Sequence, residues 1–216
     1  MMTGFTNHAP ALLSRFRRQD DGVAAIEFAL VAPLLVMFLL GTTAATQSLW
    51  AHGKVAQTSS VIGDLVSQET DIDATVFRNI MKAAPVLMEP FPVGNLAITV
   101  TAGIACHEDG NGDSENAIPK IFTIWSAKWN GGDQFVQGYA SKEKMKDAPT
   151  AISIENGDYI VQTRAAYTYT PTITRQAGYT LDMEEIAYHQ PRDASTISFP
   201  LYEPDVIPTC DELMNN

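Results

Sequence analysis

The pattern of apolar and polar positions divides the chain into three parts. An apolar run over residues 23–40 contains a single charged residue, Glu27, and a single proline, Pro33. A more polar stretch with scattered apolar residues and no proline follows to residue 68, and from residue 96 apolar and polar residues alternate over several segments. The first two patterns are typical of a long helix and the third of β-strands. We therefore predict an α+β fold, with a long N-terminal hydrophobic transmembrane helix followed by a domain with a small antiparallel sheet.

The expected boundaries follow from the same pattern. We expect a polar leader at 1–22, a transmembrane and extended N-terminal helix at 23–68, a short helix and linker at 69–95, and a mainly β domain at 96–216. Asp71 or Asp73 is expected to cap a helix over 74–84 that Pro85 ends. The apolar face of the extended helix is predicted to contain Leu49, Val55, Val61, Ile62 and Leu65. Three or four strands are expected, from the segments 96–106, 121–129, 158–169 and 181–188, with a short helix at 134–145.

The apolar run is long enough to cross a membrane. At 1.5 Å per residue, residues 23–40 span about 27 Å as a helix, against a hydrocarbon thickness of about 30 Å. Arg15, Arg17 and Arg18 precede the run, and positive residues stay on the cytoplasmic side, so the C-terminal part is expected across the membrane. The main alternative is an ordinary signal peptide cut after Ala45, although such peptides have shorter apolar stretches.

A charged side chain such as Glu27 is energetically unfavourable inside an apolar membrane helix, and residues of this kind usually have a function. No basic side chain lies within the run to pair with it. Cleavage between Gly22 and Val23 would create an α-ammonium group four residues before Glu27, on the same helix face and largely protonated at neutral pH. The alternative is that Glu27 reaches the membrane interface near the start of the helix without a special partner.

Four features of this segment occur together: a basic leader, a glycine at the candidate cut, a glutamate followed by an aromatic residue, and an apolar helix interrupted by proline. The residues are Arg15, Arg17, Arg18, Gly22, Val23, Glu27, Phe28 and Pro33. The segment resembles the N-terminus of TadE/TadG-like minor pilins, or pseudopilins, of the tight-adherence (Flp, type IVc) branch of type IV pili. The resemblance implies that 1–22 is a cytoplasmic prepilin leader, that a prepilin peptidase cuts between Gly22 and Val23, and that Glu27 pairs with an N-terminal amine during subunit assembly. It also implies a pilin-like domain after the helix.

Charge and motifs exclude several other functions. The chain has 14 basic and 25 acidic residues, a net charge of −11, so nucleic acid is not an expected partner. It contains no nucleophile-elbow, phosphate-loop or dinucleotide-binding motif, and Glu184 and Glu185, as neighbours in a strand, would point to opposite faces. We therefore expect no enzymatic activity and no cofactor.

Cys106 and Cys210 are the two cysteines, and the predicted orientation places both outside the cytoplasm, where disulfides form. We expect a bond between them, with two unpaired thiols as the alternative. TadE-like proteins often end in an Arg-Pro-Arg segment followed by a cysteine. Residues 190–192 read Gln-Pro-Arg, and the spacing to Cys210 is long, so this part departs from the family pattern.

The acidic segment at 109–115 places oxygen side chains at alternate positions, as in the first half of an EF-hand loop. The candidate ligands are Asp109, Asn111, Asp113 and Glu115. Ser114 stands where that loop has glycine, and Lys120 where it has glutamate, so the ligand set is incomplete. A solvated hairpin loop is the preferred interpretation, a weak calcium site the alternative, and no other metal site is expected.

The sequence thus predicts a structural minor pilin, single-pass in the inner membrane, with a cytoplasmic N-terminus, a periplasmic C-terminal domain and a later place in the extracellular pilus. Its expected partners are other pilin and minor pilin subunits, contacted through the N-terminal helix, and a prepilin peptidase. The alternatives are an unprocessed, signal-anchored periplasmic binding module and a secreted acidic calcium-binding domain. Trp125, Trp129 and the tyrosines of 159–169 would suit adhesion to a surface, but we expect them to serve in packing.

Overall fold

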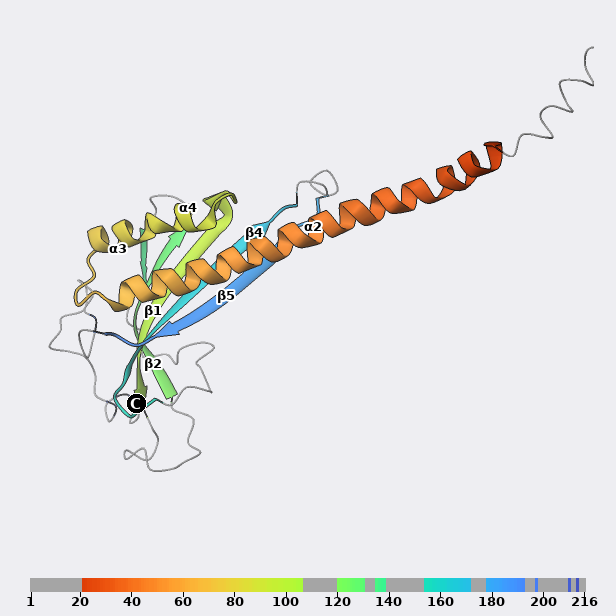
Figure 1. Ribbon diagram of the computed structural model, residues 1–216. Coiled ribbons are helices and arrows are strands. Elements are labelled where there is room, and N and C mark those ends of the chain that lie inside the picture. Colours follow the sequence, from red (N-terminus) through yellow and green to blue (C-terminus); the bar gives the residue numbers. More distant parts are fainter. Residues whose placement is uncertain are drawn as a thin grey trace, which may run out of the picture. The chain divides into compact units, whose positions relative to one another are not determined.

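The computed structural model describes residues 21–106, 120–130, 135–138, 154–171 and 178–192, together with residues 197, 210 and 213. The chain divides into two compact units, residues 1–46 and residues 47–216. A long apolar helix followed by an antiparallel sheet confirms the predicted α+β class (Figure 1). The leader arginines and the acidic segment 109–115 lie outside the described residues.

Helix α2 extends from Asp21 to Ser67, close to the predicted 23–68. In the second unit its buried positions recur every three or four residues, as expected for a helix with one face on a core. They are Ala51, Val55, Thr58, Ser59, Ile62, Gly63, Val66 and Ser67. The prediction for Leu49 was wrong, because its side chain is 75% exposed. Leu49 precedes Ala51 by two residues, and two steps of about 100° turn it to the opposite side of the helix.

Helix α3, Ala74–Met81, begins where the sequence predicted. Asp73 caps it, and one side-chain oxygen accepts hydrogen bonds from the amides of Thr75 and Val76 at 2.7 Å each. Two of the first free amides of the helix are thereby satisfied. Phe77, Ile80 and Met81 form its buried face.

The prediction that Pro85 ends this helix was wrong. The chain begins a second short helix, α4, at Ala83–Met88, and Pro85 lies inside it. Proline is tolerated in a first turn because the amide it lacks has no helical partner there. A 3-10 turn, η1, at Val93–Asn95 then leads into the sheet.

In the described part of the chain, the sheet has five strands in the order β3-β2-β1-β4-β5, and all four neighbouring pairs are antiparallel. The strands are β1 Leu96–Cys106, β2 Lys120–Asn130, β3 Phe135–Gly138, β4 Tyr159–Tyr169 and β5 Leu181–His189. Four of them match the predicted strands to within one residue at each end. The fifth, β3, lies where a helix was predicted over 134–145, so that prediction was wrong for residues 135–138.

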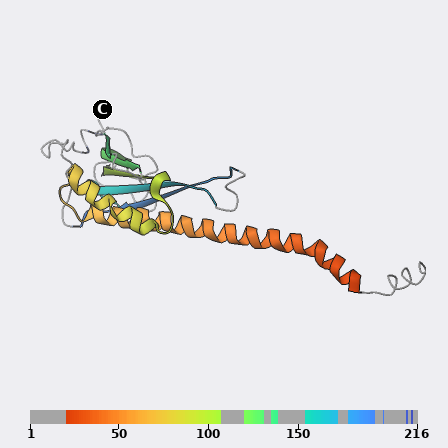
Figure 2. The same cartoon turned by 90° about the horizontal axis from the view of Figure 1, so that it is seen from above.

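Helices α3 and α4 and the C-terminal part of α2 pack on one face of the sheet (Figures 1 and 2). Alternate β1 residues face this main core, namely Leu96, Ile98, Val100 and Ala102. The opposite face carries a smaller cluster of Ala105, Ile121, Ile154 and Ile160. The division follows from the period of two along each strand.

The aromatic residues considered for adhesion belong to the interior. Trp125, Trp129 and Tyr159 are at most 8% exposed. The indole nitrogen of Trp125 donates to the Tyr159 hydroxyl at 2.9 Å, and that hydroxyl donates to the carbonyl oxygen of Ile197 at 3.0 Å. Buried polar groups satisfied in this way serve packing.

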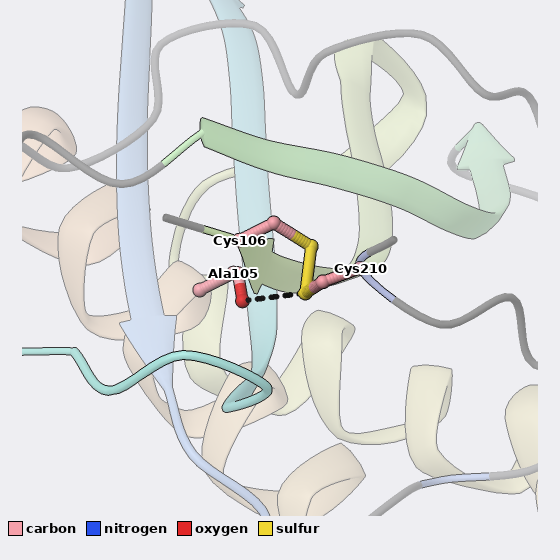
Figure 3. The surroundings of a disulfide bond; sticks show 3 residues. All are labelled: Ala105, Cys106 and Cys210. Carbon is pink, nitrogen blue, oxygen red and sulfur yellow. Dashed lines mark hydrogen bonds between the residues drawn. A yellow bond between two sulfur atoms is a disulfide. The ribbon is translucent and has the colours of Figure 1, made fainter. Parts of the chain in front are cut away.

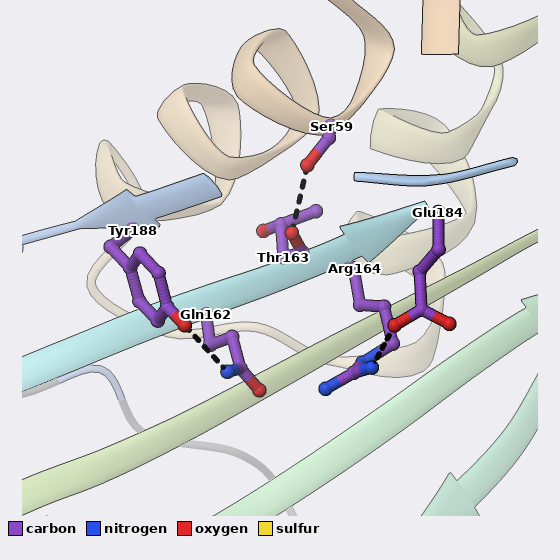
Figure 4. Close-up of polar contacts among 6 residues, drawn as sticks. All are labelled: Ser59, Gln162, Thr163, Arg164, Glu184 and Tyr188. Atoms are coloured by element: carbon purple, nitrogen blue, oxygen red, sulfur yellow. Dashed lines mark hydrogen bonds and ion pairs between the residues drawn. The ribbon is translucent and has the colours of Figure 1, made fainter. Parts of the chain in front are cut away.

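Helix α2 approaches β4 and β5 closely at Ser59 and Gly63. The Ser59 hydroxyl donates to the carbonyl oxygen of Thr163 at 2.8 Å (Figure 4). A Cβ atom built on Gly63 would lie 2.5 Å from Nδ1 of His189 and 2.9 Å from Oγ1 of Thr163. Burial lowers the pKa of His189, while Asp64 opposes this shift and Arg192 adds to it. Glycine at position 63 therefore sets the distance between helix and sheet.

Gly63→Ala is expected to destabilise the protein by about 1–2 kcal/mol, because an overpacking cost of about 2–3 kcal/mol exceeds the gain of about 1 kcal/mol in helix propensity. Gly53→Ala is the matched control, since Gly53 is exposed on the same helix with no atom within 4 Å of an added Cβ. It should stabilise by about 0.5–1 kcal/mol. Urea unfolding in mild detergent, followed by tryptophan emission, measures both variants. Equal stabilisation by the two alanines would contradict the close approach.

Candidate assembly site

The first unit presents a continuous apolar surface. Its large apolar side chains between Val23 and Leu40 are 43% to 74% exposed. They are Val23, Ile26, Phe28, Leu30, Val31, Leu34, Leu35, Val36, Met37, Phe38, Leu39 and Leu40. A soluble protein rarely exposes so many neighbouring apolar residues, so the surface is suited to lipid or to other helices. In the described part of the chain, this is the one helix with the length and composition to cross a membrane.

The predicted assembly residues lie together near the start of α2. Gly22 and Val23 are in its first turn, and Glu27 and Phe28 follow on the next. Val23 and Glu27 are four residues apart, so they share a helix face. Both are exposed in this unit, and Phe28 is 69% exposed. The arrangement leaves the Glu27 carboxylate and the Phe28 ring available to a neighbouring helix.

Most backbone amides and carbonyls of this helix form hydrogen bonds within the helix itself. Pro33 removes the amide that would bond the carbonyl of Ala29. Farther along, the Thr43 hydroxyl donates to the carbonyl oxygen of Leu39 at 2.9 Å, and the Thr46 hydroxyl to that of Thr42 at 2.9 Å. Threonines that bond back one turn hide their hydroxyls within the helix, which suits an apolar surrounding.

Acidic residues of the sheet do not gather into a reactive or metal-binding group. Glu184 pairs with Arg164 of the neighbouring strand β4 (Figure 4). Glu185 instead lies 2.9 Å from Nε2 of His52 on α2. The two carboxylates thus have separate partners, as the period of two along a strand predicts. Among the described residues, no three histidine, cysteine or acidic side chains are placed to hold a metal ion.

Cys106, at the end of β1, is disulfide-bonded to Cys210, with 5.4 Å between their Cα atoms (Figure 3). Cys106 is fully buried and Cys210 is half-buried. The Cys210 sulfur lies 3.4 Å from the carbonyl oxygen of Ala105, a contact rather than a hydrogen bond because a disulfide sulfur carries no proton. Nearby in sequence, Leu213 is 6% exposed and belongs to the main core. The bond therefore fixes the C-terminal region to the first strand.

Arg192 has a structural role that sequence reasoning missed. Its amide donates to the carbonyl oxygen of Ser67 at 3.0 Å, and its guanidinium pairs with Asp64. Gln190 donates to a carboxylate oxygen of Asp158 at 3.3 Å. The Gln-Pro-Arg segment, noted only as a departure from a family pattern, thus holds the end of α2 against the chain that leaves β5. The available signal was a charged residue three positions after the end of β5.

Comparison with known proteins gives one finding about this helix. Residues 22–61 match the family model described as TadE-like protein. Searches of curated proteins and of solved structures found no match. The matched segment begins at the glycine of the candidate cut and includes Glu27, Phe28 and Pro33. The recognition is thus confirmed for this segment: residues 22–61 are similar to TadE-like proteins, which is consistent with a protein of the tight-adherence pilus system.

Proposed function

We propose that this protein is a minor pilin, or pseudopilin, that is cut between Gly22 and Val23 by a prepilin peptidase and assembles with other pilin subunits of a tight-adherence pilus. The observation that carries the proposal is the TadE-like match, which starts at Gly22. The exposed apolar surface of the same segment supports it, because assembly would bury that surface against other helices.

The proposed mechanism has three steps. The helix first lies in the inner membrane, with the leader arginines on the cytoplasmic side. Removal of the leader then frees the α-ammonium of Val23. Glu27 pairs with an N-terminal amine, its own or that of a neighbouring subunit, and the helix moves from lipid into a bundle of helices. Pairing offsets the cost of placing either charge in an apolar surrounding.

The role proposed is structural rather than catalytic. In this role the acidic domain, residues 47–216, is displayed on the periplasmic side and later on the pilus. Any contribution to cell adhesion would come through the assembled pilus, since Trp125, Trp129 and Tyr159 are buried. We expect the domain's negative charge to keep it soluble and to disfavour binding to nucleic acid.

The N-terminal mass of the protein recovered from membranes tests the proposal. We expect a chain that begins at Val23 when an active prepilin peptidase is co-expressed, and one that begins at Met1 when the peptidase carries an inactivating substitution. Gly22→Leu is the matched variant, because a large side chain before the cut should leave the leader attached. A Met1 start under all conditions would instead indicate a permanent signal anchor, and a start after Ala45 would indicate a secreted protein.

A further inference from the structure

An aromatic pocket of about 440 Å³ lies within the second unit, beside Gln47 and Trp50 of α2. Trp50 of α2, Phe91 of the turn before β1, and Tyr169 at the end of β4 form its aromatic wall, and Gln47 and Asn95 supply amides. Residues 91 and 169 are distant in sequence from α2. The fold therefore brings three chain segments together at this one place.

The rings of the aromatic pocket hold one another in fixed orientations. Trp50 and Phe91 are edge-to-face, with centroids 5.4 Å apart, and Phe91 and Tyr169 are edge-to-face at 5.6 Å. The Tyr169 hydroxyl donates to the side-chain oxygen of Gln47 at 3.4 Å. The Asn95 amide donates to the carbonyl oxygen of Thr168 at 3.4 Å. Edge-to-face pairs are favourable beyond the area they bury, so the pocket is preformed.

One side of this wall is buried and the other is open. Tyr169 is 6% exposed, whereas Trp50 is 54% exposed and the adjacent Leu49 is 75% exposed. The other tryptophans, Trp125 and Trp129, are 2% and 8% exposed. Trp50 therefore packs against Phe91 on one side, while about half of its surface is exposed.

The sequence position of Trp50 indicates what covers it. Trp50 lies on the same continuous helix as the apolar run, ten residues after Leu40 and five after Ala45. Tryptophan and tyrosine gather at the ends of membrane spans, where a ring with one polar edge suits the headgroup region. None of the described residues that line the pocket is acidic or basic, although the chain as a whole has a charge of −11. A chain with that charge is repelled by anionic lipid, so the contact must rest on the uncharged rings.

We propose that the aromatic pocket is a lipid-binding surface, in which Trp50 lies in the headgroup region of the bilayer and docks the second unit on the membrane until the subunit is assembled. This rests on the membrane-anchoring part of the proposed function and not on cleavage or pilus assembly. The proposed partner of the pocket is the headgroup region of neutral lipids.

Tryptophan quenching in vesicles tests the proposal with the full chain. The protein is reconstituted into phosphatidylcholine vesicles whose acyl chains are brominated either close to the headgroup or close to the chain end. With Trp50 as one of three tryptophans, we expect loss of about a third of the emission with the first lipid and much less with the second. Trp50→Phe should lose almost none, because the buried Trp125 and Trp129 remain as an internal reference. High salt should not change the result.

The same samples distinguish failure of this proposal from failure of the membrane anchor. Flotation of the protein with the vesicles reports insertion of the helix, and quenching reports the position of Trp50. A protein that floats while its Trp50 emission is untouched by brominated lipid and quenched by soluble iodide would overturn the lipid-binding surface alone. A protein that does not float would overturn the anchor and, with it, this proposal. Protection of Trp50 that rises with the protein-to-lipid ratio would assign the pocket to a second subunit instead and overturn the proposal too.

Discussion

Glu27→Gln is expected to reduce incorporation of the protein into pili by about a hundredfold while leaving its membrane insertion intact. Removing one partner of a charge pair in an apolar surrounding costs about 3–5 kcal/mol, because the other charge remains uncompensated. Glutamine still accepts a hydrogen bond from the amine, so the low end of that range applies, and about 2.8 kcal/mol corresponds to a hundredfold change. Insertion should not suffer, since an amide is less costly than a carboxylate in lipid. The readouts are the amount of protein in sheared pili and its resistance to alkaline extraction from membranes.

Two matched variants separate the charge from other effects of this change. Glu27→Asp keeps the carboxylate and should retain a measurable part of the incorporation. Glu69→Gln makes the same chemical change at an exposed residue just after α2 and should leave both readouts at the wild-type level. Wild-type incorporation of Glu27→Gln would show that the carboxylate has no role in assembly. A loss of membrane insertion in that variant would instead indicate that Glu27 contributes to the anchor itself.

The parts of the fold that follow from local pattern could be predicted from the sequence. The apolar run and the absence of proline between residues 34 and 68 indicated the extent of α2, and Asp73 marked the start of α3 through the hydrogen bonds of its own carboxylate. Alternation gave β1 with both ends at the predicted residues, Leu96 and Cys106. In each case the decisive interactions lie within a few residues of one another. The TadE-like segment was recognisable for the same reason, since its pattern is contiguous.

The parts that depend on distant partners could not be predicted in this way. The short strand β3 exists because Phe135 to Gly138 pair with Trp129 to Ser126, and no periodicity within four residues distinguishes that outcome from a helix. The buried face of α2 is set by contact with β4 and β5, which is why Leu49 was assigned to the wrong side. The aromatic pocket joins α2 to Phe91 and Tyr169 through strand order, which sequence spacing does not contain.

Removal of the disulfide by the double substitution Cys106→Ala and Cys210→Ala is expected to lower the free energy of unfolding by about 4–5 kcal/mol. The bond joins residues separated by 104 positions, and in the chain-entropy account a loop of about 100 residues restricts the unfolded chain by about 4.7 kcal/mol. A typical domain is stable by about 5–15 kcal/mol, so this loss is a large part of the total. Urea unfolding of the full chain in mild detergent, followed by tryptophan emission, measures the change.

Reduction of the wild type supplies the control for this prediction, because it removes the same bond without changing a side chain. A reducing agent should shift the wild-type midpoint to that of the double-alanine variant and leave the variant where it is. The C-terminal region should also become accessible to protease before the sheet does, since Cys210, three residues before Leu213, is then no longer held at β1. If wild type and variant unfold at the same urea concentration, the bond does not constrain the unfolded chain. If the variant is less stable but its C-terminal region remains protected, core packing of Leu213 and Ile197 holds that region without the disulfide.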